Sequence, residues 1–187
     1  MTNALMASVA QTGTDRANAQ MSTQPRRTAH KLLSTPNGTL FEILASPEEV
    51  GHGICLIRGT MPPGVAVPLH SHPDSELFYV LEGSMEIFQS EEGVGGWTTV
   101  GVGAVVVVPC NVRHALRNSS SLPAIMIVVT TSKLYEFFDE VSKPFDPNRP
   151  LAPPTPEEMR AFFVTVAKYG YWVASPDENA AIGLSIG

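Results

Sequence analysis

The sequence predicts an all-β domain, a barrel or sandwich of antiparallel strands, followed by helices toward the C-terminus. Three observations predict this class. From Thr39 onward, short β-rich runs are separated by glycine and proline. No long helical pattern interrupts these runs before Thr131, and after Thr131 the apolar residues switch to a helical period. Many short strands at close spacing are typical of antiparallel sandwiches and barrels.

The expected strands follow one another with only short turns between them. The run Val105 to Val108 has no polar alternation, so we expect this strand to be covered on both faces. The β-rich runs predict strands over residues 39–45, 54–60, 65–70, 76–81, 84–89, 97–100, 104–108, 112–117 and 124–130.

The chain divides into three parts by composition. Residues 1–28 are rich in small polar residues without apolar periodicity and predict a flexible N-terminal arm. Residues 29–131 contain the expected barrel. Residues 132–187 contain helical patterns and a proline-rich stretch, and we expect this extension to pack on the barrel.

Two amphipathic helices are expected in the extension. Ser132 can cap the first helix, which Pro144 ends. Thr155 and Glu158 form a capping box for the second, with Pro156 at its first position. Each helix has a stripe of apolar residues along one face, which predicts docking on the outside of the barrel. The alternative is that the first helix closes the barrel mouth as a lid. The stripes consist of Leu134, Phe137, Phe138 and Val141 in the first helix, and Met159, Phe162, Phe163 and Val166 in the second.

Charge, hydrophobicity and cysteine content argue against several classes of protein. With 12 basic and 18 acidic side chains the net charge is -6, which argues against a nucleic-acid or anionic membrane surface. No apolar run approaches the length of a membrane span. A chain of 187 residues needs no disulfide, so we interpret Cys55 and Cys110 as small buried hydrophobes and expect a cytoplasmic protein. His30 and His52 are expected at surface or loop positions.

One short segment brings three potential metal ligands together. Residues two apart on a strand point to the same face, so His70 and His72 project together. The turn-like residues 73–75 then return the chain with Glu76 facing the same space. Glu82 and Gly83 supply the hairpin that follows.

A second segment offers a fourth ligand, His114, on the strand that leaves a turn at residues 109–112. If this strand lies across the barrel from the first, all four side chains meet. Imidazoles and a carboxylate together suit a divalent first-row metal better than magnesium or calcium.

These two segments, Gly64-x5-His70-x-His72-x3-Glu76-x6-Gly83 and Gly103-x5-Pro109-x-Asn111-x2-His114-x3-Asn118, resemble the paired motifs of the cupin superfamily. The second departs at Asn111, where glycine is usual; asparagine also enters the left-handed region readily, so the turn should persist. The resemblance implies a double-stranded β-helix, or jelly-roll barrel, with C-terminal helices. It also implies one divalent metal ion (iron, nickel, cobalt, manganese, copper or zinc).

By size and layout the chain resembles the bacterial quercetin dioxygenase-like group. This resemblance implies a metal-dependent dioxygenase acting on an aromatic or enolic small molecule, with His70, His72, Glu76 and His114 as ligands and Glu76 also as a catalytic base. Two alternatives are a metal-dependent isomerase, lyase or decarboxylase, and a non-enzymatic binding module. We also expect a homodimer, because cupins commonly pair and an open sheet edge invites pairing. By strand alternation the substrate pocket is expected to include Phe78, Val80, Met85, Leu116 and Met126.

Overall fold

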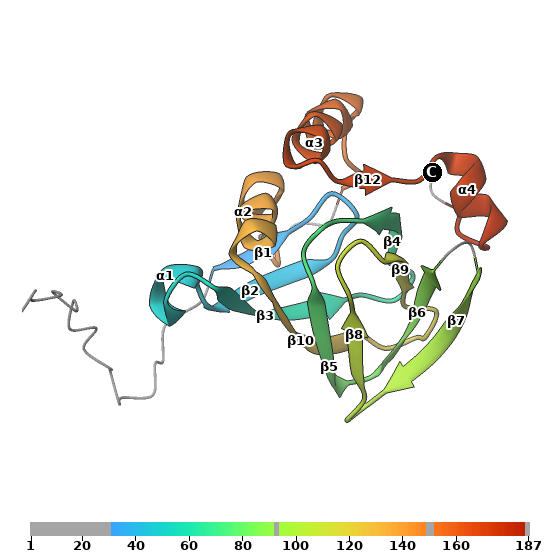
Figure 1. Cartoon of the computed structure of the whole chain (residues 1–187), viewed down its shortest axis with the longest axis horizontal. Helices are drawn as coiled ribbons and strands as arrows, with labels where there is room; N and C mark the ends of the chain where they lie inside the picture. Colours follow the sequence, from blue (N-terminus) through green and yellow to red (C-terminus); the bar gives the residue numbers. More distant parts are fainter. Residues whose placement is uncertain (1–30, 92–93, 149–151, 186–187) are drawn as a thin grey trace, which may run out of the picture.

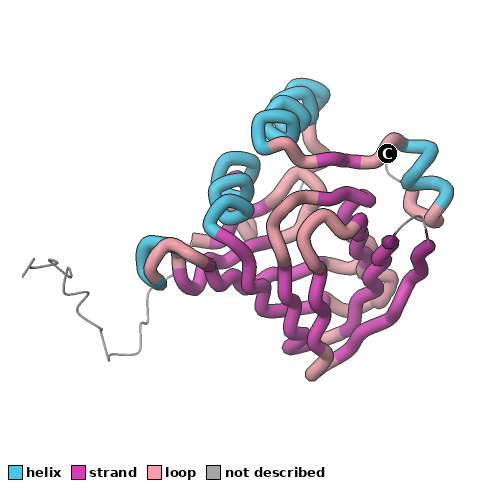
Figure 2. Tube along the Cα trace, viewed as in Figure 1, coloured by secondary structure: helices cyan, strands magenta, loops and turns pink. Residues whose placement is uncertain are grey.

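The computed structural model describes residues 31–91, 94–148 and 152–185. The expected arm, residues 1–28, and His30 lie outside these ranges. The described strands form two antiparallel sheets that face each other, and the helices of the C-terminal extension lie above one end of them (Figures 1 and 2). The predicted all-β fold with C-terminal helices is confirmed.

The larger sheet has seven strands among the described residues, and its central strands alternate strictly between core and surface. Along β10, every second side chain from Ala124 to Thr130 is buried. The inward residues of β3, β5 and β10 pack with those of the opposite sheet into one apolar core. The strand order is β11 (Lys143–Pro144), β1 (Leu32–Ser34), β2 (Leu40–Ala45), β3 (Ile54–Met61), β10 (Ala124–Thr131), β5 (Glu76–Glu82) and β8 (Val105–Val108).

Strand β8 forms an edge of this sheet. Val106 and Val108 face the core, whereas Val105 and Val107 are 58% and 55% exposed. The expectation that this strand is covered on both faces was wrong. A run of four valines indicates apolar side chains on both faces of the strand. It does not indicate that the strand lies at the edge of its sheet with one face uncovered.

The smaller sheet has five strands in the described part of the chain, and its outer face is covered by the C-terminal segment. Trp97 donates its ring N–H to the carbonyl of Ile182 at 2.7 Å. The guanidinium groups of Arg113 and Arg117 lie over Trp172 and Trp97, both at 4.1 Å from the ring centroid. The strand order is β12 (Trp172–Val173), β4 (Ala66–Ser71), β9 (Arg113–Arg117), β6 (Ser84–Glu91) and β7 (Val94–Gly101).

Both predicted helices of the extension are present, together with two short ones. The N-cap of helix α2 (Ser132–Val141) is Thr131, one residue before the expected Ser132. The Thr131 side chain accepts from the backbone N–H of Leu134. Helix α3 (Pro156–Tyr169) has the predicted capping box. The short helices are α1 (Pro47–Val50) and α4 (Pro176–Ala181). None of the described helices is long and apolar enough to cross a membrane.

Helices α2 and α3 pack against each other through aromatic rings. Phe137 lies 6.1 Å from Phe162, 5.5 Å from Tyr169 and 5.0 Å from Tyr171, measured between ring centroids. Phe138 of α2 contacts Phe41 of β2 at 4.7 Å, so the helix pair is tied to the larger sheet. The helices therefore stand over one end of the barrel (Figure 1).

Candidate metal centre

The strand arrangement brings the four predicted ligands together from both sheets. Strand β4 pairs with β9 so that His70 lies directly opposite His114. His72 follows the end of β4, and Glu76 begins β5 in the other sheet. The turn before β9 supports His72, because the N–H of Asn111 donates to the His72 carbonyl at 2.8 Å. Asn111 has φ 63°, which confirms that asparagine takes the left-handed position of this turn.

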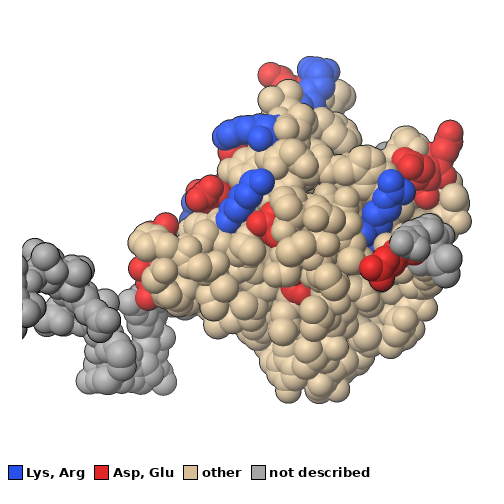
Figure 3. Space-filling model, in the orientation of Figure 1, with Lys and Arg blue, Asp and Glu red and all other residues tan. Residues whose placement is uncertain are grey.

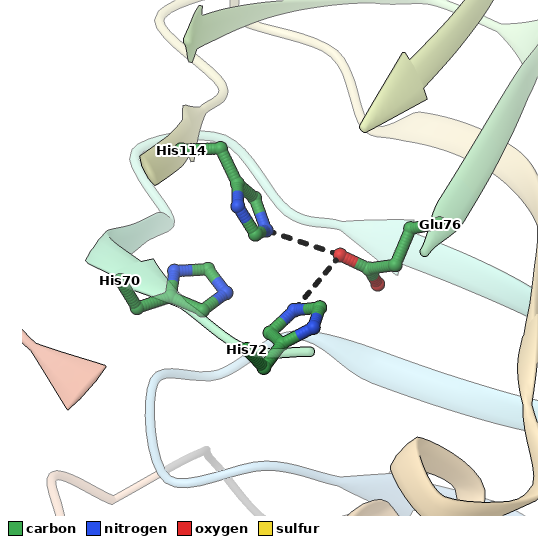
Figure 4. Close-up of side chains that lie close together, drawn as sticks. All are labelled: His70, His72, Glu76 and His114. Carbon is green, nitrogen blue, oxygen red and sulfur yellow. Dashed lines mark hydrogen bonds and ion pairs between the residues drawn. The ribbon is translucent and has the colours of Figure 1, made fainter. Parts of the chain in front are cut away.

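The ligand atoms of His70, His72, Glu76 and His114 all lie within 4.8 Å of one another. Figure 4 shows the imidazoles and the carboxylate converging on one space. Oε2 of Glu76 lies 3.1 Å from Nε2 of His114 and 3.4 Å from Nε2 of His72. His72, Glu76 and His114 are buried, and His70 is half-buried.

Each imidazole is fixed through its other nitrogen by a backbone carbonyl. Nδ1 of His70 lies 2.7 Å from the Pro68 oxygen, Nδ1 of His72 lies 2.9 Å from the Asp74 oxygen, and Nδ1 of His114 lies 2.9 Å from the Val112 oxygen. A carbonyl oxygen can only accept, so each Nδ1 carries the proton and donates. In each neutral ring the lone pair is then on Nε2, which faces the shared space.

This arrangement suits a cation at its centre. Three Nε2 lone pairs and a carboxylate are all acceptors, and acceptors buried at these distances repel unless positive charge lies between them. Protons can supply that charge in part, and a divalent ion supplies it fully. Since imidazole and carboxylate are common ligands of transition metals, the cluster fits a divalent metal site.

The acid–base properties agree with a site that attracts positive charge. Burial alone would raise the pKa of Glu76, but hydrogen bonds and charge from His114 and His72, when these rings carry a proton on Nε2, hold it well below its usual range. Burial would lower the pKa of His72, but Glu76 raises it above its usual value. The pKa of His70 is far below its usual value, because surrounding protein excludes water and the other two imidazoles repel a proton.

Three residues of the cluster, His70, His72 and Glu76, line a cavity of about 530 Å³ between the barrel and the helices, and His114 lies behind them. Apolar side chains from β2, β5, β10, α2 and α3 form most of the surface, and Tyr171 and Trp172 add to it. The ionisable side chains among the described lining residues are His70, His72, Glu76 and Tyr171. The cavity therefore offers a metal site and an otherwise mainly apolar, aromatic surface.

The structure places the other predicted positions as follows. Phe78, Leu116 and Met126 line the cavity, whereas Val80 and Met85 are buried in the barrel core and are not part of its wall. Cys55 is buried as expected. Cys110 is exposed, so its interpretation as a buried hydrophobe was wrong. It lies at the surface because the turn that carries it projects from the barrel. His52 is exposed, as expected of a surface or loop position.

Sequence reasoning missed much of the cavity wall. Phe41, Tyr171 and Trp172 were not proposed for the pocket, and the two helices were expected on the outside of the barrel. Residues of both helices line the cavity, including Phe137, Phe138 and Phe162. Their apolar stripes indicated burial, but no local signal showed what would cover them.

Comparison with known proteins agrees with the fold. A family model described as the cupin domain matches residues 57–130, the segment that contains all four cluster residues. No curated protein matches the chain significantly by sequence.

Several solved structures resemble part of the chain. An RmlC-like cupin from Shewanella frigidimarina is 18% identical over 59% of this chain and 91% of its own, with a TM-score of 0.48. A predicted oxalate decarboxylase from Thermotoga maritima is 22% identical over 50% of this chain and 79% of its own, with a TM-score of 0.45. A DMSP lyase from Ruegeria pomeroyi is 27% identical over 43% of this chain and 39% of its own, with a TM-score of 0.38.

These neighbours bear different activities in their names, and likeness of this degree does not transfer an activity. Residues 57–130 thus match the model of the cupin domain, and the two-sheet barrel described above agrees with a cupin fold.

Proposed function

We propose that this protein is a metal-dependent dioxygenase acting on an aromatic or enolic small molecule. The observation that carries the proposal is the convergence of three imidazoles and one carboxylate beside a mainly apolar cavity, which His70, His72 and Glu76 line. His70, His72, Glu76 and His114 would hold a divalent ion there, which would supply Lewis-acid chemistry to a bound enol or phenol.

The cavity wall supports a neutral, planar substrate. No lysine, arginine or aspartate is found among the described lining residues, so a phosphate or carboxylate substrate would have no cationic side chain to pair with. Aromatic side chains of Phe41, Phe137, Phe138 and Phe162 present faces and edges on which a ring can stack. A volume of about 530 Å³ is suited to a molecule of two or three rings.

Glu76 is our candidate for accepting the hydroxyl proton of the substrate. It is the carboxylate among the described lining residues, and it lies within the ligand cluster where that hydroxyl would bind.

Oxygen uptake with a panel of flavonols, catechols and β-diketones tests the proposal, after loading with iron, nickel, cobalt, manganese or copper. We expect metal-dependent uptake with at least one substrate, and a loss of at least about 100-fold in His72→Ala because it removes a ligand. His52→Asn is the matched control, since His52 is an exposed histidine with φ 69° and asparagine tolerates that conformation.

The same experiment distinguishes the alternatives. Product formation under strict anaerobiosis would identify an isomerase, lyase or decarboxylase, and tight binding without turnover would identify a binding module. Uptake that survives in His72→Ala would contradict a metal-centred dioxygenase.

We also propose that the protein is a homodimer and works in the cytoplasm. Figure 3 shows few charged side chains over strands β5 and β8, and Tyr79, Val105 and Val107 are exposed there. A contiguous apolar edge of this kind favours pairing with a second copy. Light scattering should give twice the monomer mass, and Val105→Lys/Val107→Lys should reduce it to that of one chain.

A further inference from the structure

Asp74 lies between the ligands His72 and Glu76 in the sequence and is 4% exposed. Its backbone carbonyl accepts from Nδ1 of His72 at 2.9 Å. Its carboxylate accepts from the Tyr171 hydroxyl at 2.7 Å through one oxygen and from the Thr131 hydroxyl through the other. Thr131 is also the N-cap of α2. Asp74 thus connects residues 72–76, here called the ligand loop, to the barrel, to α2 and to the C-terminal segment.

The C-terminal segment runs along the strand that carries His70. Strand β12 pairs Val173 with His70 and Trp172 with Ser71. The contact extends past His70 to Leu69, since Ala174 donates to the Leu69 carbonyl and Asn179 accepts from the Leu69 N–H, both at 2.8 Å. This segment lies outside residues 57–130, yet it borders the metal centre.

Tyr171 begins this contact and has two interactions with the ligand loop. Its ring lies 5.3 Å from the His72 ring, and its hydroxyl binds Asp74. Because Tyr171 also packs against Phe137 at 5.0 Å, its ring is held on both sides. The hydroxyl has one buried acceptor, and the acceptor belongs to the residue whose carbonyl orients His72.

We propose that Tyr171 is a positioning residue of the metal centre, which acts through Asp74 to keep Nε2 of His72 directed at the ion. This inference rests on the metal centre of the proposed function, but not on its reaction. Removing the hydroxyl leaves one Asp74 oxygen without its donor in a buried place. The loop then relaxes, and the carbonyl of Asp74 no longer fixes the His72 ring.

Cobalt affinity of Tyr171→Phe tests the proposal. Titration of metal-free protein with Co²⁺ against a competing chelator should give a dissociation constant about tenfold above that of the unchanged protein. Tyr169→Phe is the matched control. Its hydroxyl also binds a carboxylate, that of Glu140 at 3.2 Å, and its ring lies 5.6 Å from that of Tyr171, but it has no described contact with the ligand loop. We expect its Co²⁺ affinity to be unchanged.

Two readouts distinguish positioning from general destabilisation. Thermal unfolding of the metal-free proteins measures the stability cost of each change separately, and this cost should be larger in Tyr171→Phe because its acceptor is buried whereas the Tyr169 contact is exposed. The Nδ1–H signal of His72 in nuclear magnetic resonance should move or exchange faster in Tyr171→Phe alone. Equal losses of Co²⁺ affinity in both variants, or an unchanged His72 signal, would overturn the proposal.

A double-mutant cycle tests the route through Asp74. Once Asp74→Asn has weakened the acceptor, adding Tyr171→Phe should lower Co²⁺ affinity little further. Full additivity would show that Tyr171 acts by another route and would overturn the proposal. If no substrate supports oxygen uptake but the variants change Co²⁺ affinity as expected, the dioxygenase proposal fails and the role of Tyr171 stands. If the protein without substitutions binds no Co²⁺, both the proposed function and the role of Tyr171 are overturned.

Discussion

Single residues determine how two tight turns between the sheets close. The expectation of a hairpin at Glu82 and Gly83 was wrong, because β5 and β6 belong to different sheets and do not pair. Gly83 joins β5 to β6 with φ 69°, and a Cβ there would collide with the Pro123 carbonyl oxygen and lie 3.1 Å from its carbon. Gly64 has φ 78°, but nothing lies within 4 Å of the corresponding Cβ position. The two glycines therefore share a left-handed backbone but differ in the space around it.

This difference predicts unequal costs of substitution. Gly64→Ala should lower the free energy of unfolding by about 1 kcal/mol, which is the cost of the left-handed conformation alone. Gly83→Ala should cost about 3 kcal/mol or more, because backbone must also move. Urea unfolding of both variants measures the difference, and equal costs would show that the Pro123 contact relaxes freely.

An ion pair on the smaller sheet gives the stability a pH dependence. Arg117 donates to both carboxylate oxygens of Glu86 at 2.8 and 3.0 Å, and with Ser119 it lowers the pKa of Glu86 to about 2. A carboxyl group whose pKa is lower in the folded state stabilises the fold above its unfolded pKa, near 4.5. That contribution is lost as the pH falls from about 4.5 toward 2.

Glu86→Gln should therefore be less stable than the unchanged protein by about 1 kcal/mol at pH 7, because the pair is partly exposed. The difference should shrink as the pH falls below 4.5. Urea unfolding of both proteins in the presence of a chelator, between pH 3 and 7, measures it. A difference that stays constant over this range would show that the ion pair is not its source.

At the scale of elements, α2 and α3 form one wall of the cavity as well as a small core of their own. Phe137 is the centre of that core, with four aromatic neighbours and 8% exposure. Phe163, on the other side of α3, is 50% exposed. The helix pair is thus held to the barrel mainly by one face.

Phe137→Ala should lower the free energy of unfolding by about 3 kcal/mol and weaken the binding of an aromatic probe, since it leaves a void beside the cavity. Phe163→Ala should cost less than about 1 kcal/mol and leave probe binding unchanged. Calorimetric unfolding and a fluorescent hydrophobic probe measure the two effects. Similar probe binding in both variants would contradict a role of α2 in the cavity wall.

At the scale of the whole molecule, the sequence predicts the barrel and its ligand cluster because both depend on local patterns. Residues two apart on a strand must share a face, and Asn111 can replace glycine in a left-handed turn. These rules bring His70, His72 and Glu76 together before any tertiary contact is known. The helices at 132–141 and 156–169 follow from period and capping in the same way.

Features that depend on distant pairing were not predictable. Strand β12 has two residues and exists because it pairs with β4, about a hundred positions away. The role of Tyr171 depends on that pairing and has no motif of its own. The exposure of Val105 and Val107 depends on which strand ends the sheet, which apolar content does not report.

The two tryptophans of the chain both lie where the C-terminal segment meets the smaller sheet. Trp97 belongs to the sheet and Trp172 to the segment, and each is stacked under an arginine. Intrinsic fluorescence of this protein is therefore a local signal: it reports whether residues 171–184 are attached, while circular dichroism reports the barrel as a whole. A change in tryptophan emission that precedes the loss of the circular dichroism signal would reveal a state in which residues 171–184 have detached. In that state one side of the strand that carries His70 is open to solvent.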